Sequence, residues 1–373
     1  MEQKKELKPY AISSVSTKDK FIGLPKNLKE LPRKLALLCL EIEKTCIDYT
    51  GVLKGKRFLL AVSGGADSTA MAVIFSLLSR KNNFDIEIAH INHNLRPEST
   101  QELIFVQELA QRLKIQFHAF NLPIKDMAKK YNMGLEEAGR KGRQEALSTL
   151  REKIHADYIL TAHHAGDLAE DILMRLTRGT GWPALGGMAI LNNYWFRPFL
   201  HTLPDDLRQF LITIGQNWCE DSSNKDMSFT RNRFRHEILP LFLRENREYI
   251  RNLIELNMQA QTDAAYWNDK INNCLSALPW KEKIRDGSME IFLPKNLLDQ
   301  LACAERTRVY MKVFKRMKEI SGQPVHARSR TILKLEKHLC LEKRGIFQFP
   351  GKLLVKTLKH GVLFTVPIKS ATK

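Results

Sequence analysis

The sequence lacks any apolar run long enough to cross a membrane. A membrane-spanning helix needs about 20 consecutive apolar residues, and the 373-residue chain contains no such run. Its first ten residues, MEQKKELKPY, mix acidic residues with lysines and lack the apolar core of a signal peptide. We therefore expect a cytoplasmic protein with no membrane partner.

Paired cysteines are also missing. None of the six cysteines stands in a C-x-x-C pair, which argues against zinc ribbons, iron-sulfur clusters and disulfide scaffolds. The expectation is free thiols, mostly buried. The phosphate-binding pattern G-x-x-x-x-G-K-[ST] is absent as well, because GVLKGKR at Gly51 has the wrong spacing and no hydroxyl after its lysine.

Charge of one sign is in excess. The chain has 59 Lys and Arg against 41 Asp and Glu, a net charge of +18. Residues 306–344 hold twelve Lys or Arg and three Glu, a net charge of +9. An excess of this kind favours a polyanionic partner such as nucleic acid, and a merely basic, solvated surface is the alternative.

The order of apolar runs predicts an α/β protein. From 57 to 161 the apolar runs RFLLAV, DIEIAHI, IQFHAF and DYILTA alternate with amphipathic stretches that begin near residues 67, 98, 135 and 167. This alternation predicts a parallel sheet covered by helices. From 239 to about 320 the pattern is helical and without strands, and short strands follow it. The predicted segments are a mobile extension (1–28), a catalytic domain (29–240), a helical domain (241–321) and a small basic α+β module (322–373).

The stretch AVSGGADSTAM at residues 61–71 predicts a phosphate-binding loop. Gly64 and Gly65 allow a tight turn that brings backbone N–H groups close to an anion, and the helix that follows adds partial positive charge. The hydroxyls of Ser63 and Ser68 are expected to donate to phosphate oxygens. Asp67 is expected to cap the helix, and a carboxylate beside phosphates also implies Mg²⁺. A simple capped helix after a glycine turn is the alternative.

Polar residues follow two more of the predicted strands, at the edge where open α/β sheets bind ligands. HINHNLRPES follows the second strand and AHHAGDLAE the fourth. For the histidines of these segments a zinc site is one hypothesis, a part in the nucleotide pocket is another, and structural hydrogen bonding is a third. They are His90, His93, His163 and His164, with Arg96 beside them in the first segment.

Five ordered segments carry a resemblance to a known family. They accompany SGGADS and are HINHNLRPES, EEAGRKGR, the stretch from AHHAGDLAE to PALGGM, FRPFL, and WCEDSSNKDMSFTRNRFRHEILPLF. SGGADS resembles the PP-loop of ATP pyrophosphatases, and the set resembles the tRNA(Ile)-lysidine synthase family from about residue 57 to 241. The resemblance implies a parallel-sheet PP-loop nucleotide-binding domain, adenine nucleotide alpha-hydrolase-like in fold.

The resemblance implies a reaction and its partners. ATP adenylates the C2 oxygen of the wobble cytidine in a tRNA(Ile) with a CAU anticodon, and the ε-amine of free L-lysine then attacks C2. ATP is expected on the loop, and Mg²⁺ on Asp67. The residues expected to bind the nucleotide are Ser63, Gly64, Gly65, Ala66, Asp67, Ser68 and His90. The oligomeric state stays open, with a homodimer as one option.

The family's lysine-recognition positions match Arg140, Asp167 and Glu170. The two carboxylates stand three residues apart, hence on one helix face, where they are expected to hold the amine and accept a proton. A planar guanidinium such as that of Arg140 suits a carboxylate. Charge pairing at a helix start is the alternative for the two acids.

Arginines Arg231, Arg233 and Arg235 stand beside two phenylalanines, a combination that suits phosphate contacts and base stacking in tRNA. A solvated helix start is the alternative. The chain departs from the family pattern D-Q-x-E-T at Leu168 and Asp171. Two rival functions remain, a thiolase-type tRNA sulfur transferase and a tRNA-binding protein without catalysis. The scattered cysteines argue against the first, and the presence of Asp67, Asp167 and Arg140 against the second.

Overall fold

The computed structural model describes residues 24–92, 99–220, 226–277, 280–325, 329–341 and 343–369. They form two compact units, which divide between Met258 and Gln259, with Gly181–Ala184 grouped with the second unit. Most of the predicted N-terminal extension, and both His93 and Arg96, lie outside the described residues.

A six-stranded sheet with the order β3-β2-β1-β4-β6-β5 forms the centre of the first unit. All neighbouring strands are parallel except β5 and β6, which are antiparallel. The strands are β1 (Arg57–Ala61), β2 (Asp85–Asn92), β3 (Gln116–Asn121), β4 (Tyr158–Leu160), β5 (Leu191–Asn192) and β6 (Trp195–Phe196). The predicted parallel sheet is thus confirmed.

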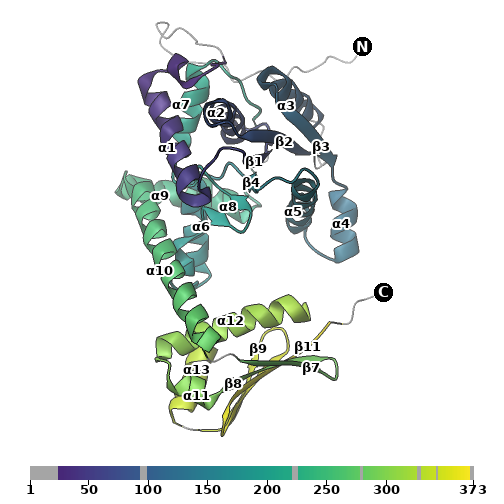
Figure 1. Cartoon of the computed structure of the whole chain (residues 1–373), viewed down its shortest axis with the longest axis vertical. Helices are drawn as coiled ribbons and strands as arrows, with labels where there is room; N and C mark the ends of the chain where they lie inside the picture. The colour runs from purple at the N-terminus through teal and green to yellow at the C-terminus, as the bar shows by residue number, and fades with distance from the viewer. Residues whose placement is uncertain are drawn as a thin grey trace. The chain divides into compact units, whose positions relative to one another are not determined.

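Helices cover both faces of this sheet. The central residues of β1 are all apolar, so the side chains on both of its faces need to be buried. Phe58 and Leu60 belong to the large core that includes α2, whereas Leu59 packs on the other face with Leu147 and Leu150 of α5. The helices of the sheet region are α1 (Arg33–Thr50), α2 (Ala66–Asn82), α3 (Ser99–Leu113), α4 (Ile124–Tyr131), α5 (Leu135–Lys153), α6 (Ala165–Thr177) and α7 (Pro204–Thr213) (Figure 1). Short 3-10 helices occur at Leu28–Glu30 and Ala184–Gly186.

The chain then continues in helices. These are α8 (Thr230–Arg233), the π-helical turn η4 (Phe234–Ile238), α9 (Leu239–Glu245) and the long α10 (Tyr249–Ala277). None of the described helices is both long and apolar enough to cross a membrane.

The second unit is built on an antiparallel sheet with the order β7-β8-β11-β10-β9. Its elements are β7 (Lys281–Arg285), β8 (Ser288–Pro294), α11 (Lys295–Asp299), α12 (Cys303–Ser321), α13 (Ser329–Cys340), β9 (Gly345–Phe349), β10 (Leu353–Leu358) and β11 (Gly361–Pro367) (Figure 1). Tyr310 of α12 packs against Phe364 of β11, with ring centroids 5.8 Å apart.

Two strands, β7 and β8, lie in the stretch that was expected to be strand-free. In β8 the buried residues Met289, Ile291 and Leu293 alternate with half-buried ones, which is the period of a strand with one face on a core. β7 is exposed throughout and its sequence KEKIR has no apolar alternation. Its pairing with β8 is a tertiary effect that composition does not reveal.

The cysteines are free, but the expectation that most are buried is wrong. Cys39 and Cys46 are buried, Cys219 and Cys274 are half-buried, and Cys303 and Cys340 are exposed. The exposed pair stands at the first residue of α12 and the last of α13, where a helix leaves the core.

Gly361, the first residue of β11, is expected to be indispensable to the second unit. Its φ is +151°, and a Cβ there would lie 2.1 Å from the carbonyl oxygen of Leu293. Gly361→Ala should therefore lower the free energy of unfolding by about 3 kcal/mol or more. Hydrogen exchange of residues 281–294 in the full chain measures this.

Gly287→Ala is the matched control. Gly287 also has a positive φ, +71°, but a Cβ there would meet no atom within 4 Å. Only the cost of the left-handed backbone applies, about 1 kcal/mol. Equal losses in the two variants would show that the contact with Leu293 is unimportant.

Candidate active site

The predicted phosphate loop lies between β1 and α2 and is held by its own hydrogen bonds. Gly64 has a φ of +98°, which glycine adopts without strain. The Oγ of Ser68 accepts from the backbone N–H groups of Ser63 and Gly64, each at 3.2 Å, and donates to the carbonyl of Gly65 at 3.0 Å. The hydroxyl of Ser68 thus shapes the loop, whereas it was expected to donate to phosphate.

The start of α2 presents its first N–H groups to this loop. Gly65 is the N-cap residue, and no side chain caps the helix. The N–H groups of the first turn therefore precede any acceptor within the helix and can bind an anion. The expectation that Asp67 caps α2 is wrong, because its carboxylate points away to His164.

Asp67 has one engaged and one unsatisfied oxygen. Its Oδ2 lies 3.5 Å from Nε2 of His164, and its Oδ1 is buried without a hydrogen-bond partner. A buried carboxylate oxygen without a donor fits a cation. Within the described part of the chain, no three His, Cys, Asp or Glu residues gather to hold a metal. Asp67 would thus be the protein's single carboxylate ligand, with phosphate oxygens supplying others, as is usual for Mg²⁺.

His164 closes the N-terminus of α6 by a reciprocal cap. Its ring Nδ1 accepts from the backbone N–H groups of Gly166 and Asp167, at 3.0 and 3.3 Å. The backbone N–H of His164 in turn donates to Oδ2 of Asp167 at 3.0 Å. Because Nδ1 is an acceptor, the ring proton of the neutral imidazole resides on Nε2, the atom that faces Asp67.

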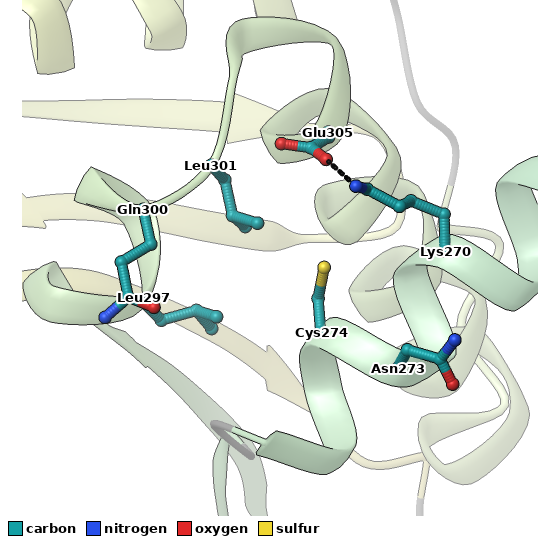
Figure 2. Close-up of a pocket in the computed structure, with 7 residues that line it drawn as sticks. All are labelled: Lys270, Asn273, Cys274, Leu297, Gln300, Leu301 and Glu305. Carbon is teal, nitrogen blue, oxygen red and sulfur yellow. Dashed lines mark ion pairs between the residues drawn. The ribbon is translucent and has the colours of Figure 1, made fainter.

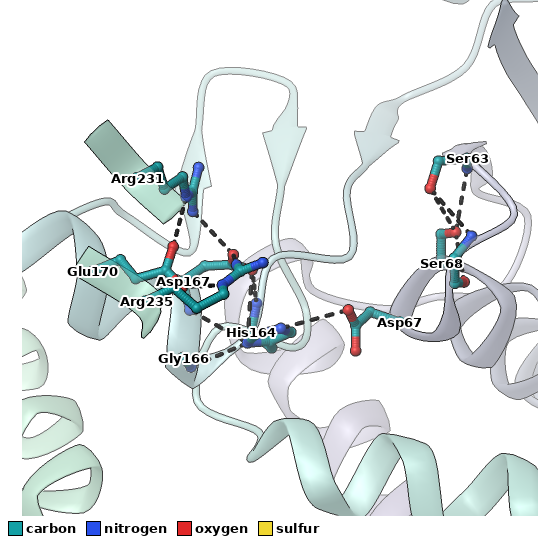
Figure 3. Close-up of polar contacts among 10 residues, drawn as sticks. Ser63, Asp67, Ser68, His164, Gly166, Asp167, Glu170, Arg231 and Arg235 are labelled. Atoms are coloured by element: carbon teal, nitrogen blue, oxygen red, sulfur yellow. Dashed lines mark hydrogen bonds and ion pairs between the residues drawn. The ribbon is translucent and has the colours of Figure 1, made fainter. Parts of the chain in front are cut away.

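Asp167 and Glu170 face two arginines from the segment that follows α7. Arg231 donates to Glu170 at 2.7 Å and to Asp167 at 2.9 Å. Arg235 donates to the same two carboxylates, at 2.5 and 3.2 Å. Figure 3 shows this four-residue group, called here the ionic cluster, and the contacts that lead from it through His164 to Asp67.

Helical spacing explains which arginines join the ionic cluster. Arg231 and Arg235 stand four residues apart across α8 and η4, hence on one face. Arg233 lies on another face and donates to the backbone carbonyls of Met227 and Ser228, at 2.9 and 2.8 Å. The three arginines predicted to bind tRNA therefore all have protein partners in this structure, and their role with tRNA stays a prediction.

Burial and charge act in opposite directions on the ionic cluster. Burial raises the pKa of Asp167, but the neighbouring imidazole of His164 and guanidinium of Arg231 outweigh it, and the pKa is lowered. Burial lowers the pKa of Arg231, and the charges of Asp167 and Glu170 raise it above its ordinary value. Both groups are thus held in their charged forms, and Asp167 is a weak proton acceptor while the arginines remain bound.

Arg140 lies on α5, is exposed, and makes no ion pair with any described residue. Arg143 lies one helical turn after Arg140 on α5. Its pKa is lowered, mainly by desolvation and to a smaller extent by the positive charges of Arg140 and Arg231. The charge of Arg231 in the ionic cluster thus acts on α5. Arg140 and Arg143 both lack an ion pair among the described residues, and the role of Arg140 in binding a carboxylate stays a prediction.

Burial favours the neutral form of His90 and His163. His90 is buried, donates from Nδ1 to the carbonyl of Val62 at 2.9 Å, and has an Nε2 without a partner. Burial lowers its pKa. Burial likewise lowers the pKa of His163 to about 4, and its Nδ1 lies 2.9 Å from the hydroxyl of Thr161.

A cavity of about 430 Å³ lies elsewhere, in the second unit. It contains the ion pair of Lys270 and Glu305, at 3.4 Å, together with Cys274 and Leu297 (Figure 2). No residue predicted to belong to the site lines it. A cavity with one internal ion pair and no unpaired charge gives no reason to place the chemistry there.

Sequence reasoning missed the link between His164 and Asp67. The sequence contained one signal for the cap formed by His164: in HAGD, an N-cap residue is followed by an acid three positions later. Histidine is an unusual N-cap, so the pattern did not stand out. The contact with Asp67 depends on two segments almost 100 residues apart and has no local signature.

The fold and the site define a PP-loop protein, and a family model described as a PP-loop domain matches residues 38–242. A tRNA(Ile)-lysidine synthase of Nitratidesulfovibrio vulgaris is 37% identical over 321 residues, which cover 82% of this chain and 91% of that protein. One of Petrotoga mobilis is 33% identical over 58% of this chain and 70% of its own length. The chain therefore belongs to the tRNA(Ile)-lysidine synthase family.

Another relative of that name, from Thermosipho africanus, is 33% identical and is matched over 53% of its length and 60% of this chain. Among solved structures, the U34-tRNA thiolase NcsA of Methanococcus maripaludis has a TM-score of 0.50 at 14% identity, over 59% of this chain and 76% of that one. At this identity the likeness concerns the fold alone.

Glu170→Gln is expected to lower the free energy of unfolding of the first unit by about 3 kcal/mol. The Glu170 side chain is only 2% exposed, and its loss of charge leaves two guanidiniums on Asp167 alone, a change that is costly in buried ion pairs. Urea unfolding of the full chain measures the effect.

Asp171→Asn on the same helix is the control. Asp171 pairs with Arg175 at 2.9 Å, with both side chains 22–30% exposed. Partly exposed pairs of this kind contribute less than about 1 kcal/mol. If both variants lost the same free energy of unfolding, the ionic cluster would stabilise the first unit no more than a partly exposed ion pair does.

Proposed function

We propose that this chain uses ATP to join free L-lysine to C2 of the wobble cytidine in a tRNA(Ile) with a CAU anticodon. The observation that carries the proposal is the continuous set of contacts from the PP-loop through Asp67 and His164 to the ionic cluster. It brings a phosphate-binding site and a pair of carboxylates into one active site. Membership of the family supports the identity of the substrates.

In the first proposed step, the C2 oxygen of the cytidine attacks the α-phosphorus of ATP and pyrophosphate leaves. The N–H groups at the start of α2 and the loop residues Ser63 to Ser68 bind the phosphates, and His90 borders the nucleotide. Mg²⁺ on Oδ1 of Asp67 would neutralise charge that develops on the phosphates. In the second step the ε-amine of lysine forms a bond to C2, and AMP leaves with the former C2 oxygen.

The lysine ammonium must lose a proton before it attacks, because an ammonium has no lone pair. Asp167 and Glu170 are the proposed acceptors, with Arg140 bound to the lysine carboxylate. Every oxygen of the two acids already accepts a hydrogen bond from Arg231, Arg235 or the backbone of His164. We propose that a guanidinium moves away when the amine binds, because the two arginines already neutralise the carboxylates and would repel a third cation.

We propose that tRNA phosphates supply the competing partner for these arginines. The departure of Arg231 or Arg235 removes positive charge from Asp167, which raises its pKa and makes it a better proton acceptor. Lysine activation would then follow tRNA binding. Under this proposal, Arg231 and Arg235 contact tRNA phosphates during the reaction, and Arg233 contacts phosphates of the same tRNA.

The second unit supports tRNA as a partner through a group of basic side chains. A cavity of about 550 Å³ is lined by Lys295, Arg306, Lys343, Arg344, Lys359 and His360 against the single acid Asp299. The side chains of Lys343, Arg344 and Lys359 make no ion pair with any described residue. Such a concentration of positive charge suits backbone phosphates.

The test is incubation of the full chain with ATP, Mg²⁺, radiolabelled lysine and an unmodified tRNA(Ile) transcript with cytidine at the wobble position. Nuclease digestion and mass analysis should give a lysine-bearing cytidine that depends on ATP. A transcript with uridine at that position is the control. Pyrophosphate release without lysine in the nucleoside would refute lysine as the nucleophile, and tRNA binding without pyrophosphate release would refute catalysis.

Asp67→Asn and Asp167→Asn should separate the two steps. Asp67→Asn is expected to abolish tRNA-dependent pyrophosphate release, because the cation loses its carboxylate ligand. Asp167→Asn should retain most of this release but reduce transfer of lysine by about 100-fold or more, the usual size of a lost acid-base contribution. Equal loss of both partial reactions in Asp167→Asn would overturn this division of roles.

A further inference from the structure

The imidazole of His164 is fixed in place more firmly than a helix cap requires. A Cβ on Gly166 would lie 2.9 Å from Cε1 and 3.1 Å from Nδ1 of this ring, so glycine is needed for the ring to lie against the helix start. The backbone directly after the ring is also held, since Ala165 donates to the carbonyl of Thr202 at 2.9 Å. The ring therefore has little freedom to turn.

The fixed ring presents a single hydrogen to the PP-loop side. Two backbone N–H groups occupy Nδ1, which leaves Nε2 to carry the proton. Nε2 faces Oδ2 of Asp67 at 3.5 Å (Figure 3). Because Nε2 faces Oδ2, the other oxygen, Oδ1, is left for another partner, and Oδ1 is the buried atom without a hydrogen-bond partner.

We propose that His164 is a positioning residue that orients the carboxylate of Asp67 for a divalent cation. The arrangement matches a general feature of metal sites, in which a neighbouring hydrogen bond fixes the direction of a ligand and raises affinity. Gly166 contributes to this positioning because its lack of a side chain makes room for the imidazole ring of His164. The inference rests on the proposed function in that it takes ATP and its cation as the occupants of the loop.

His164→Asn separates the two roles of the histidine. Asparagine is a good N-cap and can still accept from the first N–H groups of α6, but its side chain is too short to reach Asp67. Gly166→Ala is the complementary variant, because it displaces the ring and leaves every side chain of the contact in the sequence. His118→Asn is the control, since His118 also contacts a carboxylate, Glu87 at 2.6 Å, and belongs to no part of the site.

Binding of Mn²⁺ to the full chain, measured by water proton relaxation with a non-hydrolysable ATP analogue, is the first measurement. His164→Asn and Gly166→Ala should each weaken Mn²⁺ binding by about tenfold or more, the usual effect of losing such a neighbour. His118→Asn should bind as the wild type does. The Mg²⁺ concentration that gives half-maximal pyrophosphate release should rise by the same factor.

Thermal unfolding without ligand distinguishes positioning from mere capping. His164→Asn is expected to unfold near the wild-type temperature. If it bound Mn²⁺ like the wild type, or if weaker binding simply followed a loss of folded protein, the positioning role would be overturned. If the wild type itself bound no Mn²⁺ with the analogue, both this inference and the proposed function would fail, which is a different result from failure in the variant alone.

Discussion

The ionic cluster is the interaction on which the arrangement of the site depends. Asp167 and Glu170 on α6 are bound by Arg231 and Arg235, which come from a segment about 60 residues later in the chain. The two carboxylates are largely buried, and buried charges are stable only when they have partners. The pairing fixes α8 and η4 against α6, and it also fixes the carboxylates next to the capped end of that helix.

Under the proposed function, the same cluster gives the site two states of charge. With the arginines bound, the carboxylates are neutralised and poorly basic. With the arginines drawn to phosphate, the carboxylates have free oxygens for an ammonium. Under the proposed function, one set of residues thus serves both the stability of the free protein and the order in which substrates are used. His164 connects these carboxylates to Asp67, so the PP-loop and the ionic cluster meet at the start of α6.

Much of the fold followed from local patterns. The runs RFLLAV and DIEIAHI predicted β1 and β2, and the glycines before Asp67 predicted a loop between strand and helix. These predictions succeeded because alternation and glycine conformation are local properties of the backbone. β7 was not predicted, because KEKIR has no apolar face and becomes a strand only by pairing with β8. The role of Ser68 in the loop was missed for a similar reason, since a hydroxyl can bond the backbone as readily as a ligand.

The sequence by itself determined the sheet and the loop between β1 and α2, because these depend on spacing along the chain. It identified Asp67, Asp167, Glu170 and the arginines as candidates without saying which of them touch. Only the tertiary structure decided that Arg231 and Arg235 bind the two acids while Arg233 does not, and that His164 faces Asp67. Those contacts join segments that are about 60 to 100 residues apart, and only the packing of helices on the folded sheet brings their charges within hydrogen-bond distance.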